Sequence, residues 1–204
     1  MTYPGCFTQQ STFRTILLTT SLLVSSAAAP GLADPTQWSG FDQKLSLQGI
    51  GFRVSSPNNT SLSPVKIETT GLALGDQVLQ READGIVTGA EVADLDGDGS
   101  PELYIYTTSA GSGSYGNLIG YAVNNGKSLS DIYLPPLEAG DDAAIGYSGH
   151  DEFAVVGTTL VRRFPLYRVG DTNAAPGGGT RQLQYTLEPG EAGRVLRLEK
   201  VTDY

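Results

Sequence analysis

The sequence predicts an all-β protein, a single-domain antiparallel β-sandwich. Three observations predict this class. Apolar and polar residues alternate in short runs, the runs are bounded by turn residues, and apolar residues at helical spacing do not persist over three turns. The 204 residues include 26 Gly and 11 Pro, which suits a chain with many turns. Short strands at this spacing are typical of sandwiches and barrels.

The predicted strands follow one another along the chain from residue 44 onward. The first, 44–54, alternates strictly, and the turn residues of 55–59 end it. The other predicted strands are 65–69, 86–93, 102–107, 118–123, 129–134, 153–156, 159–167, 182–187 and 195–201. Neither of the longest breaks, 140–149 and 170–179, resembles a domain linker, so 34–204 are expected to form one domain.

The first 33 residues are predicted to be a secretory signal peptide and not a part of the folded domain. Arg14 precedes a short apolar run, 16–24, and small residues follow it. The run is too short for a membrane span, which needs about 20 residues. Cleavage after Ala29 or Ala33 is possible, and Ala33 is preferred because Pro30 would follow Ala29. An exported, periplasmic protein is therefore expected, and Cys6, the only cysteine, would be removed.

The charge balance restricts the partners of the mature chain. Its formal net charge is −9, and removal of Arg14 leaves 12 basic and 22 acidic residues, or 12 − 22 = −10. An acidic chain argues against a nucleic-acid partner, which requires a basic surface. The charge can simply keep an exported protein soluble, or it can attract a cationic protein.

An acidic turn is a candidate calcium site. Asp94, Asp96, Asp98 and Glu102 stand at positions 1, 3, 5 and 9 of a glycine-containing segment, and alternating carboxylates can supply several calcium ligands. An EF-hand is excluded, because this segment has Ile105 at position 12, where an EF-hand loop has Glu, and because strands rather than helices are predicted on both sides. The alternative is a turn in which the Asp side chains accept hydrogen bonds from backbone amides without a metal.

The sequence gives little support for catalysis. His150 is the only histidine, and a hydrolase that used it would need a nucleophile and an orienting carboxylate beside it. No Gly-x-Ser-x-Gly motif marks such a nucleophile, and Ser109, Ser112 and Ser114 lie in a glycine-rich turn without the context of a strand leading to a helix. A protein that is not an enzyme is therefore expected, with no catalytic residue and no cofactor other than the possible calcium.

The segment 109–117 is the most informative part of the sequence. It lies between two predicted strands and consists of small residues and one tyrosine, Tyr115. Most hairpin loops have two to five residues. A longer loop of glycines and serines can project toward a partner, with Tyr115 as a rigid contact. The alternative is a loose tip with Tyr115 folded onto the protein's own surface.

Ser112-Gly113-Ser114-Tyr115 resembles the Ser-Gly-x-Tyr loop of the bacterial periplasmic inhibitors of invertebrate-type (I-type) lysozyme, the PliI family. Further blocks resemble the same family in the same order, and together they cover roughly 85–204, with weaker likeness back to Leu45. These blocks are 87–91, 102–106, 128–136, 149–156, 161–165, 170–171 with Asn173, and 189–193.

The resemblance implies a β-sandwich inhibitor that inserts this loop into the cleft of an I-type lysozyme, and it allows for a homodimer. It implies that Ser112 and nearby amides bind one catalytic carboxylate while Tyr115 reaches the other; Ser114 fills the variable position. His150 and Asp151 lie in a similar block and are possible secondary contacts. The alternative function is a calcium-stabilised exported binding or adhesion module built on Asp94–Glu102.

Overall fold

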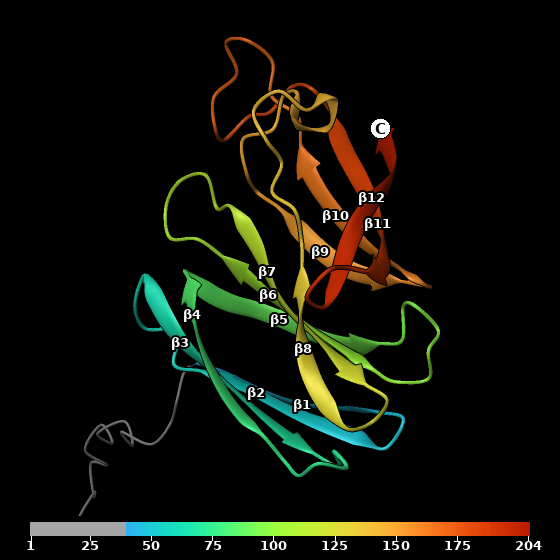
Figure 1. Cartoon of the computed structure of the whole chain (residues 1–204). Coiled ribbons are helices and arrows are strands. Elements are labelled where there is room, and N and C mark those ends of the chain that lie inside the picture. Colours follow the sequence, from blue (N-terminus) through green and yellow to red (C-terminus); the bar gives the residue numbers. More distant parts are fainter. Residues whose placement is uncertain (1–39) are drawn as a thin grey trace, which may run out of the picture. The chain divides into compact units, whose positions relative to one another are not determined.

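The computed structural model describes residues 40–204, which lie within one compact unit. The predicted signal peptide, residues 1–33, lies outside the described residues. The all-β prediction is confirmed, because the described chain forms two β-sheets and one short 3₁₀ turn, η1 (Asp142–Ala144) (Figure 1). No helix in residues 40–204 is long and apolar enough to cross a membrane.

The smaller sheet is antiparallel and has the order β1-β2-β3-β4. Its strands are β1 (Phe41–Leu47), β2 (Ile50–Ser56), β3 (Leu62–Thr70) and β4 (Val78–Asp84). The prediction of one strand over 44–54 was wrong. The chain reverses at Gln48 and Gly49, whose φ angles of 51° and 82° match the two-residue turn of a tight hairpin. Strand β4 was not predicted, because its sequence is mostly polar and most of its residues are exposed.

The larger sheet has the order β5-β6-β7-β8-β12-β11-β10-β9. Every neighbouring pair is antiparallel except β8 and β12, which run parallel over a short stretch. The strands are β5 (Ile86–Ala93), β6 (Glu102–Thr108), β7 (Gly116–Asn124), β8 (Ser128–Tyr133), β9 (Glu152–Val156), β10 (Thr159–Pro165), β11 (Thr180–Pro189) and β12 (Arg194–Asp203).

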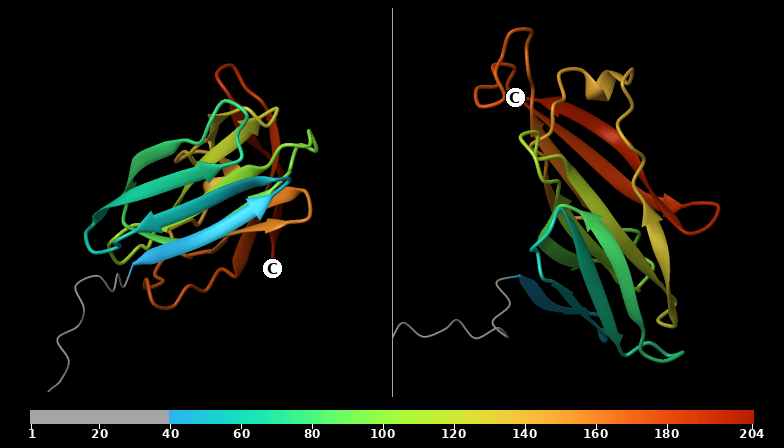
Figure 2. Two further views of the ribbon diagram at one scale, coloured as in Figure 1. Left: turned by 90° about the horizontal axis from the view of Figure 1, so that it is seen from below. Right: turned by 90° about the vertical axis from the view of Figure 1, so that its left-hand side faces the viewer.

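Two apolar cores lie on opposite faces of β5–β7. One fills the space between these strands and the smaller sheet, and it includes Phe52, Ile67, Leu103 and Ile105. The other lies inside the curved larger sheet and includes Tyr104, which is fully buried. Successive side chains of a strand point to opposite faces, so β6 contributes to both cores and six of its seven residues are buried. Figure 2 shows the smaller sheet stacked on this part of the larger one.

The larger sheet curves until its two edge strands, β5 and β9, almost meet. Glu91 of β5 closes the remaining gap, because its Oε2 accepts hydrogen bonds from the Val155 amide of β9 (2.8 Å) and from the Tyr106 hydroxyl (2.5 Å). A carboxylate therefore satisfies a backbone amide that a further strand would otherwise pair. Strand β6 lies between β5 and β7 and is buried on both faces, and a turn of functional interest extends from each of its ends.

Candidate functional site

The predicted binding loop connects β6 to β7. Because β7 already begins at Gly116, the loop proper is 109–115, seven residues rather than the expected nine. Its base is closed twice: the Ser109 amide donates to the Tyr115 carbonyl (2.8 Å), and Ser109 Oγ accepts from the Tyr115 amide (3.0 Å). At the tip, the Ser114 amide donates to the Gly111 carbonyl (3.2 Å). The loop therefore has a defined internal fold.

A second segment, residues 147–151, supports the loop from one side. The backbone amide of His150 donates to the carbonyls of both Gly113 (2.9 Å) and Ser114 (3.1 Å). Gly149 makes this approach possible: a Cβ atom at this position would lie 1.9 Å from the Gly113 carbonyl oxygen, and its φ of 90° also favours glycine. His150 itself has a φ of 59°, so the segment adopts an uncommon backbone conformation to reach the loop.

Asp151 supports the end of the loop from within the protein. Its carboxylate accepts hydrogen bonds from the Gly116 amide, the Tyr147 hydroxyl and Arg162 Nε, each at 2.7 Å. Its side chain is completely buried. The expectation that Asp151 forms a secondary contact with a partner therefore changes, since a fully buried carboxylate offers no surface to bind. Asp151 instead connects Gly116, the first residue of β7, to Arg162 of β10.

Aromatic side chains continue this support up to Tyr115. Arg162 donates from Nη2 to the Tyr147 hydroxyl (2.7 Å), and its guanidinium lies 5.1 Å from the centre of the Tyr147 ring. Burial and the hydrogen bond to the Asp151 carboxylate raise the pKa of Tyr147, so its hydroxyl stays protonated as a donor. The Tyr115 ring packs edge-on against Tyr147, with centroids 5.8 Å apart, and 49% of Tyr115 remains exposed. Tyr115 is thus held in place yet available.

A hollow of about 310 Å³ lies beside the loop. Tyr115, Tyr147 and Arg162 line it together with Leu134, Pro135 and Pro136 of the segment that follows β8. The loop therefore does not stand alone on a flat surface, because Tyr115 borders this depression.

A third segment reaches the tip of the loop. The side-chain amide of Asn173 donates from Nδ2 to the Ser112 carbonyl, and its Oδ1 lies 3.0 Å from His150 Nε2. Asn173 belonged to a block that resembled the PliI family, but spacing alone gave no reason to connect it with Ser112, 61 positions away. Only the fold brings these segments together.

The hydrogen bonds of this site use the backbone of the loop more than its side chains. Three successive carbonyls, those of Ser112, Gly113 and Ser114, accept bonds from outside the loop. Among the described residues, no hydrogen bond occupies the Ser112 or Tyr115 hydroxyl. The loop is uncharged, and Arg162 pairs with the Asp151 carboxylate behind it, while the exposed Asp84 also lines the hollow beside the loop. The loop itself therefore adds no negative charge that would repel a negatively charged site.

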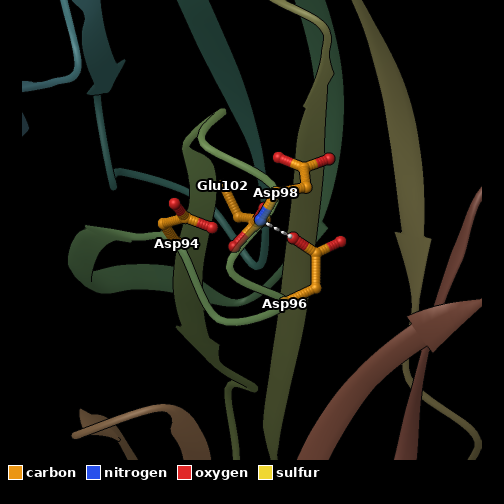
Figure 3. A group of neighbouring side chains, drawn as sticks. All are labelled: Asp94, Asp96, Asp98 and Glu102. Atoms are coloured by element: carbon orange, nitrogen blue, oxygen red, sulfur yellow. Dashed lines mark hydrogen bonds between the residues drawn. The ribbon is translucent and has the colours of Figure 1, made fainter.

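The acidic turn lies at the other end of β6 and is organised differently (Figure 3). Its carboxylates accept bonds from the turn's own amides: Asp94 Oδ2 from Gly99 (3.1 Å), Asp96 Oδ1 from Asp98 (3.2 Å) and Asp98 Oδ1 from Ser100 (2.8 Å). The structure therefore contains the backbone-capping pattern that was the alternative to calcium.

An arginine and a buried glutamate complete the turn. Arg194 of β12 donates to Asp96 Oδ2 (2.8 Å) and to Asp98 Oδ2 (2.9 Å). Glu102 is only 1% exposed and accepts from the Leu95 amide (2.7 Å). Burial, together with the neighbouring Asp side chains, raises the pKa of Glu102 to about 8.

Asp94, Asp96, Asp98 and Glu102 each place a carboxylate oxygen within 4.8 Å of the others, which suits a hard cation. However, Arg194 already supplies positive charge to two of them. The calcium site remains a prediction.

A comparison with protein families gives one match. Residues 72–144 match the model of PliI, the periplasmic lysozyme inhibitor of I-type lysozyme. The matched segment is 73 of the 204 residues and contains the acidic turn, β6 and the loop, so the resemblance seen in the sequence is confirmed there. It ends before His150, Asp151 and Asn173. No curated protein and no solved structure shows significant similarity to the chain. The match supports a role as a lysozyme inhibitor rather than as an enzyme.

Proposed function

We propose that this protein is a periplasmic inhibitor of I-type lysozyme that inserts the loop Ser112-Gly113-Ser114-Tyr115 into the lysozyme's active-site cleft. The observation that carries the proposal is that the segment matching the inhibitor family contains this loop, whose backbone is fixed by hydrogen bonds and whose Ser112 and Tyr115 hydroxyls have no hydrogen-bond partner within residues 40–204. A rigid backbone with unoccupied donors is what a loop needs to bind without a large loss of conformational entropy.

The chemistry of the loop suits the catalytic site of a lysozyme. Lysozymes hydrolyse glycosidic bonds with a pair of carboxylic side chains. In the proposed complex the Ser112 hydroxyl and nearby amides donate to one carboxylate and the Tyr115 hydroxyl donates to the other. Gly111 and Gly113 keep the loop narrow, and the absence of acidic residues between 109 and 115 avoids repulsion by the target's carboxylates.

The charge of the whole chain supports the choice of partner. A net charge near −10 for the mature chain favours association with a cationic protein, and the neutral loop limits repulsion at the contact itself. The hollow beside Tyr115 would receive the rim of the cleft. A homodimer, which the resemblance allows for, is a separate proposal that light scattering of the purified protein can test.

A lysis assay on peptidoglycan tests the function. The chain from Asp34 onward is mixed with I-type, chicken-type or goose-type lysozyme, and turnover by the chain alone is measured as a control. We expect strong inhibition of the I-type enzyme, weaker or absent inhibition of the others, and no turnover by the chain itself. Full activity of all three lysozymes at micromolar chain would refute the inhibitor function, whereas turnover by the chain alone would indicate a glycan hydrolase.

A further inference from the structure

The segment between β10 and β11, residues 166–179, has hydrogen bonds of its own and carries Asn173 near its middle. Asp171 Oδ2 accepts from the amides of Arg168 and Gly177, each at 2.7 Å, and so draws the two sides of the segment together. The Tyr167 hydroxyl donates to the carbonyl of Asn173 (3.0 Å). These bonds fix the backbone around Asn173 without using its side chain, which is therefore available to reach the binding loop.

The hydrogen bonds determine the orientation of the Asn173 amide. The Ser112 carbonyl can only accept, so the Asn173 atom facing it is the donor Nδ2. Oδ1 therefore faces His150 and can only accept, which means that His150 Nε2 carries a proton in this contact. His150 thereby orients the amide that binds Ser112, while its own backbone amide binds Gly113 and Ser114.

The backbone conformation of Ser112 depends on the hydrogen bond from Asn173 more than the rest of the loop does. It lies between Gly111 and Gly113, and two flanking glycines leave the peptide groups on either side free to rotate. Within the described residues, the hydrogen bonds internal to the loop join Ser109 to Tyr115 and Gly111 to Ser114, and neither involves Ser112. The Asn173 amide is the group that fixes the Ser112 carbonyl, and hence the backbone from which the Ser112 side chain projects.

We propose that Asn173 is a positioning residue for lysozyme binding, which holds Ser112 in the conformation that enters the cleft, with His150 orienting the Asn173 amide. Asn173 has this role only if the loop binds a lysozyme, as proposed above. Its physical effect is to raise the fraction of free protein that is already competent to bind. The apparent affinity scales with that fraction, while the contacts of the complex are unchanged.

Three variants and one control test the positioning role. Asn173→Ala removes both contacts. Asn173→Asp keeps the shape but replaces the donor that faces the Ser112 carbonyl with an acceptor. His150→Asn removes the imidazole and retains a residue type that tolerates the positive φ at this position. Val169→Ala is the matched control, because Val169 lies in the same segment and its side chain is fully exposed.

Hydrogen exchange of the free protein gives the first readout and needs no lysozyme. We expect the amides of the loop to exchange about three- to ten-fold faster in Asn173→Ala, the range that loss of one neutral hydrogen bond gives, and at least as fast in Asn173→Asp. Val169→Ala should exchange like the wild type. Unchanged exchange in both Asn173 variants would overturn the positioning role, whether or not the protein inhibits any lysozyme.

Association and dissociation rates with I-type lysozyme give the second readout. We expect both Asn173 variants to associate about three- to ten-fold more slowly and to dissociate within about two-fold of the wild-type rate. His150→Asn should show a smaller decrease of the same kind and add nothing when combined with Asn173→Ala. A loss confined to the dissociation rate would overturn the proposal, because it would make Asn173 a direct contact. Absence of binding by the wild type would refute the proposed function and leave the exchange result standing.

Discussion

Strand β6 carries two turns, and they use their polar groups in opposite ways. At its start, the carboxylates of the acidic turn bind amides of the same turn and Arg194, so most of their oxygens are already paired within the protein, and Asp94 Oδ1 is an exception. At its end, the loop 109–115 is held through its backbone carbonyls by His150 and Asn173. The side chains of Ser112 and Tyr115 stay available. The side chains of the first turn therefore mainly stabilise the fold, whereas the second turn leaves side chains available for binding.

The largest effect is expected from Asp151→Ala, which removes the shared support of the loop and the core. Arg162 would be left buried without its partner, and loss of one member of a buried pair costs about 3–5 kcal/mol of unfolding free energy. Denaturant titration would measure the loss. Asp131→Ala is the control, since Asp131 pairs with Arg81 but its side chain is 72% exposed, and a change of less than about 1 kcal/mol is expected. Equal effects of the two substitutions would contradict the structural role of Asp151.

The acidic turn should make stability depend on pH through Glu102. Its pKa in the folded protein is about 8, above the ordinary 4.5, so between these values the folded state holds a proton that the unfolded chain has released. The free energy of unfolding should therefore fall as pH rises from about 4.5 to 8, by a few kcal/mol at most. Glu102→Gln should remove this slope, because the amide does not titrate, and its oxygen can still accept the hydrogen bond from the Leu95 amide. Glu199→Gln, at an exposed position of β12, should leave the slope unchanged.

If the acidic turn binds calcium, the ion should stabilise the folded protein. Isothermal titration of chelator-treated protein, with melting temperature as a second readout, tests the prediction from the sequence. Binding should raise the melting temperature of the wild type and be weakened in Asp94→Asn. No heat at millimolar calcium would show that the turn is complete with its own amides and Arg194.

In the loop 109–115, Tyr115→Ala should reduce the binding free energy by about 2 kcal/mol or more, as expected for an aromatic anchor at the centre of an interface. Ser112→Ala should weaken inhibition by a smaller amount, because it removes only a hydroxyl. Since Tyr115 is half exposed, both variants should unfold close to the wild-type midpoint. Inhibition constants and denaturation midpoints measured together separate binding from stability. Unchanged inhibition by both variants would remove the loop from the interface.

The smallest but most specific effect is expected from a pair of glycine substitutions. Gly149→Ala and Gly157→Ala both place a Cβ on a residue with positive φ, and this backbone strain costs about 1–2 kcal/mol of stability in each, to which Gly149→Ala adds the cost of displacing the loop. Only at Gly149 does the new atom collide with the binding loop, at the Gly113 carbonyl; the surroundings of Gly157 are open. Inhibition should therefore weaken in Gly149→Ala alone. Equal inhibition by the two variants would mean that the position of the loop does not matter.

The sequence by itself determined the fold class, most of the strands and the two turns worth testing. Alternation and turn residues are local signals, so strands such as 86–93 were predicted at their observed bounds. These local signals did not predict the hairpin turn after β1 or strand β4. Gln48 is an unusual hairpin residue, and β4 is too polar and exposed to show an apolar face. The Ser-Gly-Ser-Tyr loop was identified from its glycine-rich sequence and its resemblance to PliI.

Only the tertiary structure decided how these parts support one another. Asp151 looked like a surface contact and is a buried support, because β10 brings Arg162 to it. Ser112 and Asn173 meet across 61 positions, and Asp96 of the acidic turn pairs with Arg194 of β12, 98 positions later. Contacts at such separations leave no periodic trace in the sequence. They depend on which strands the curved sheet places side by side, and that is a property of the folded chain.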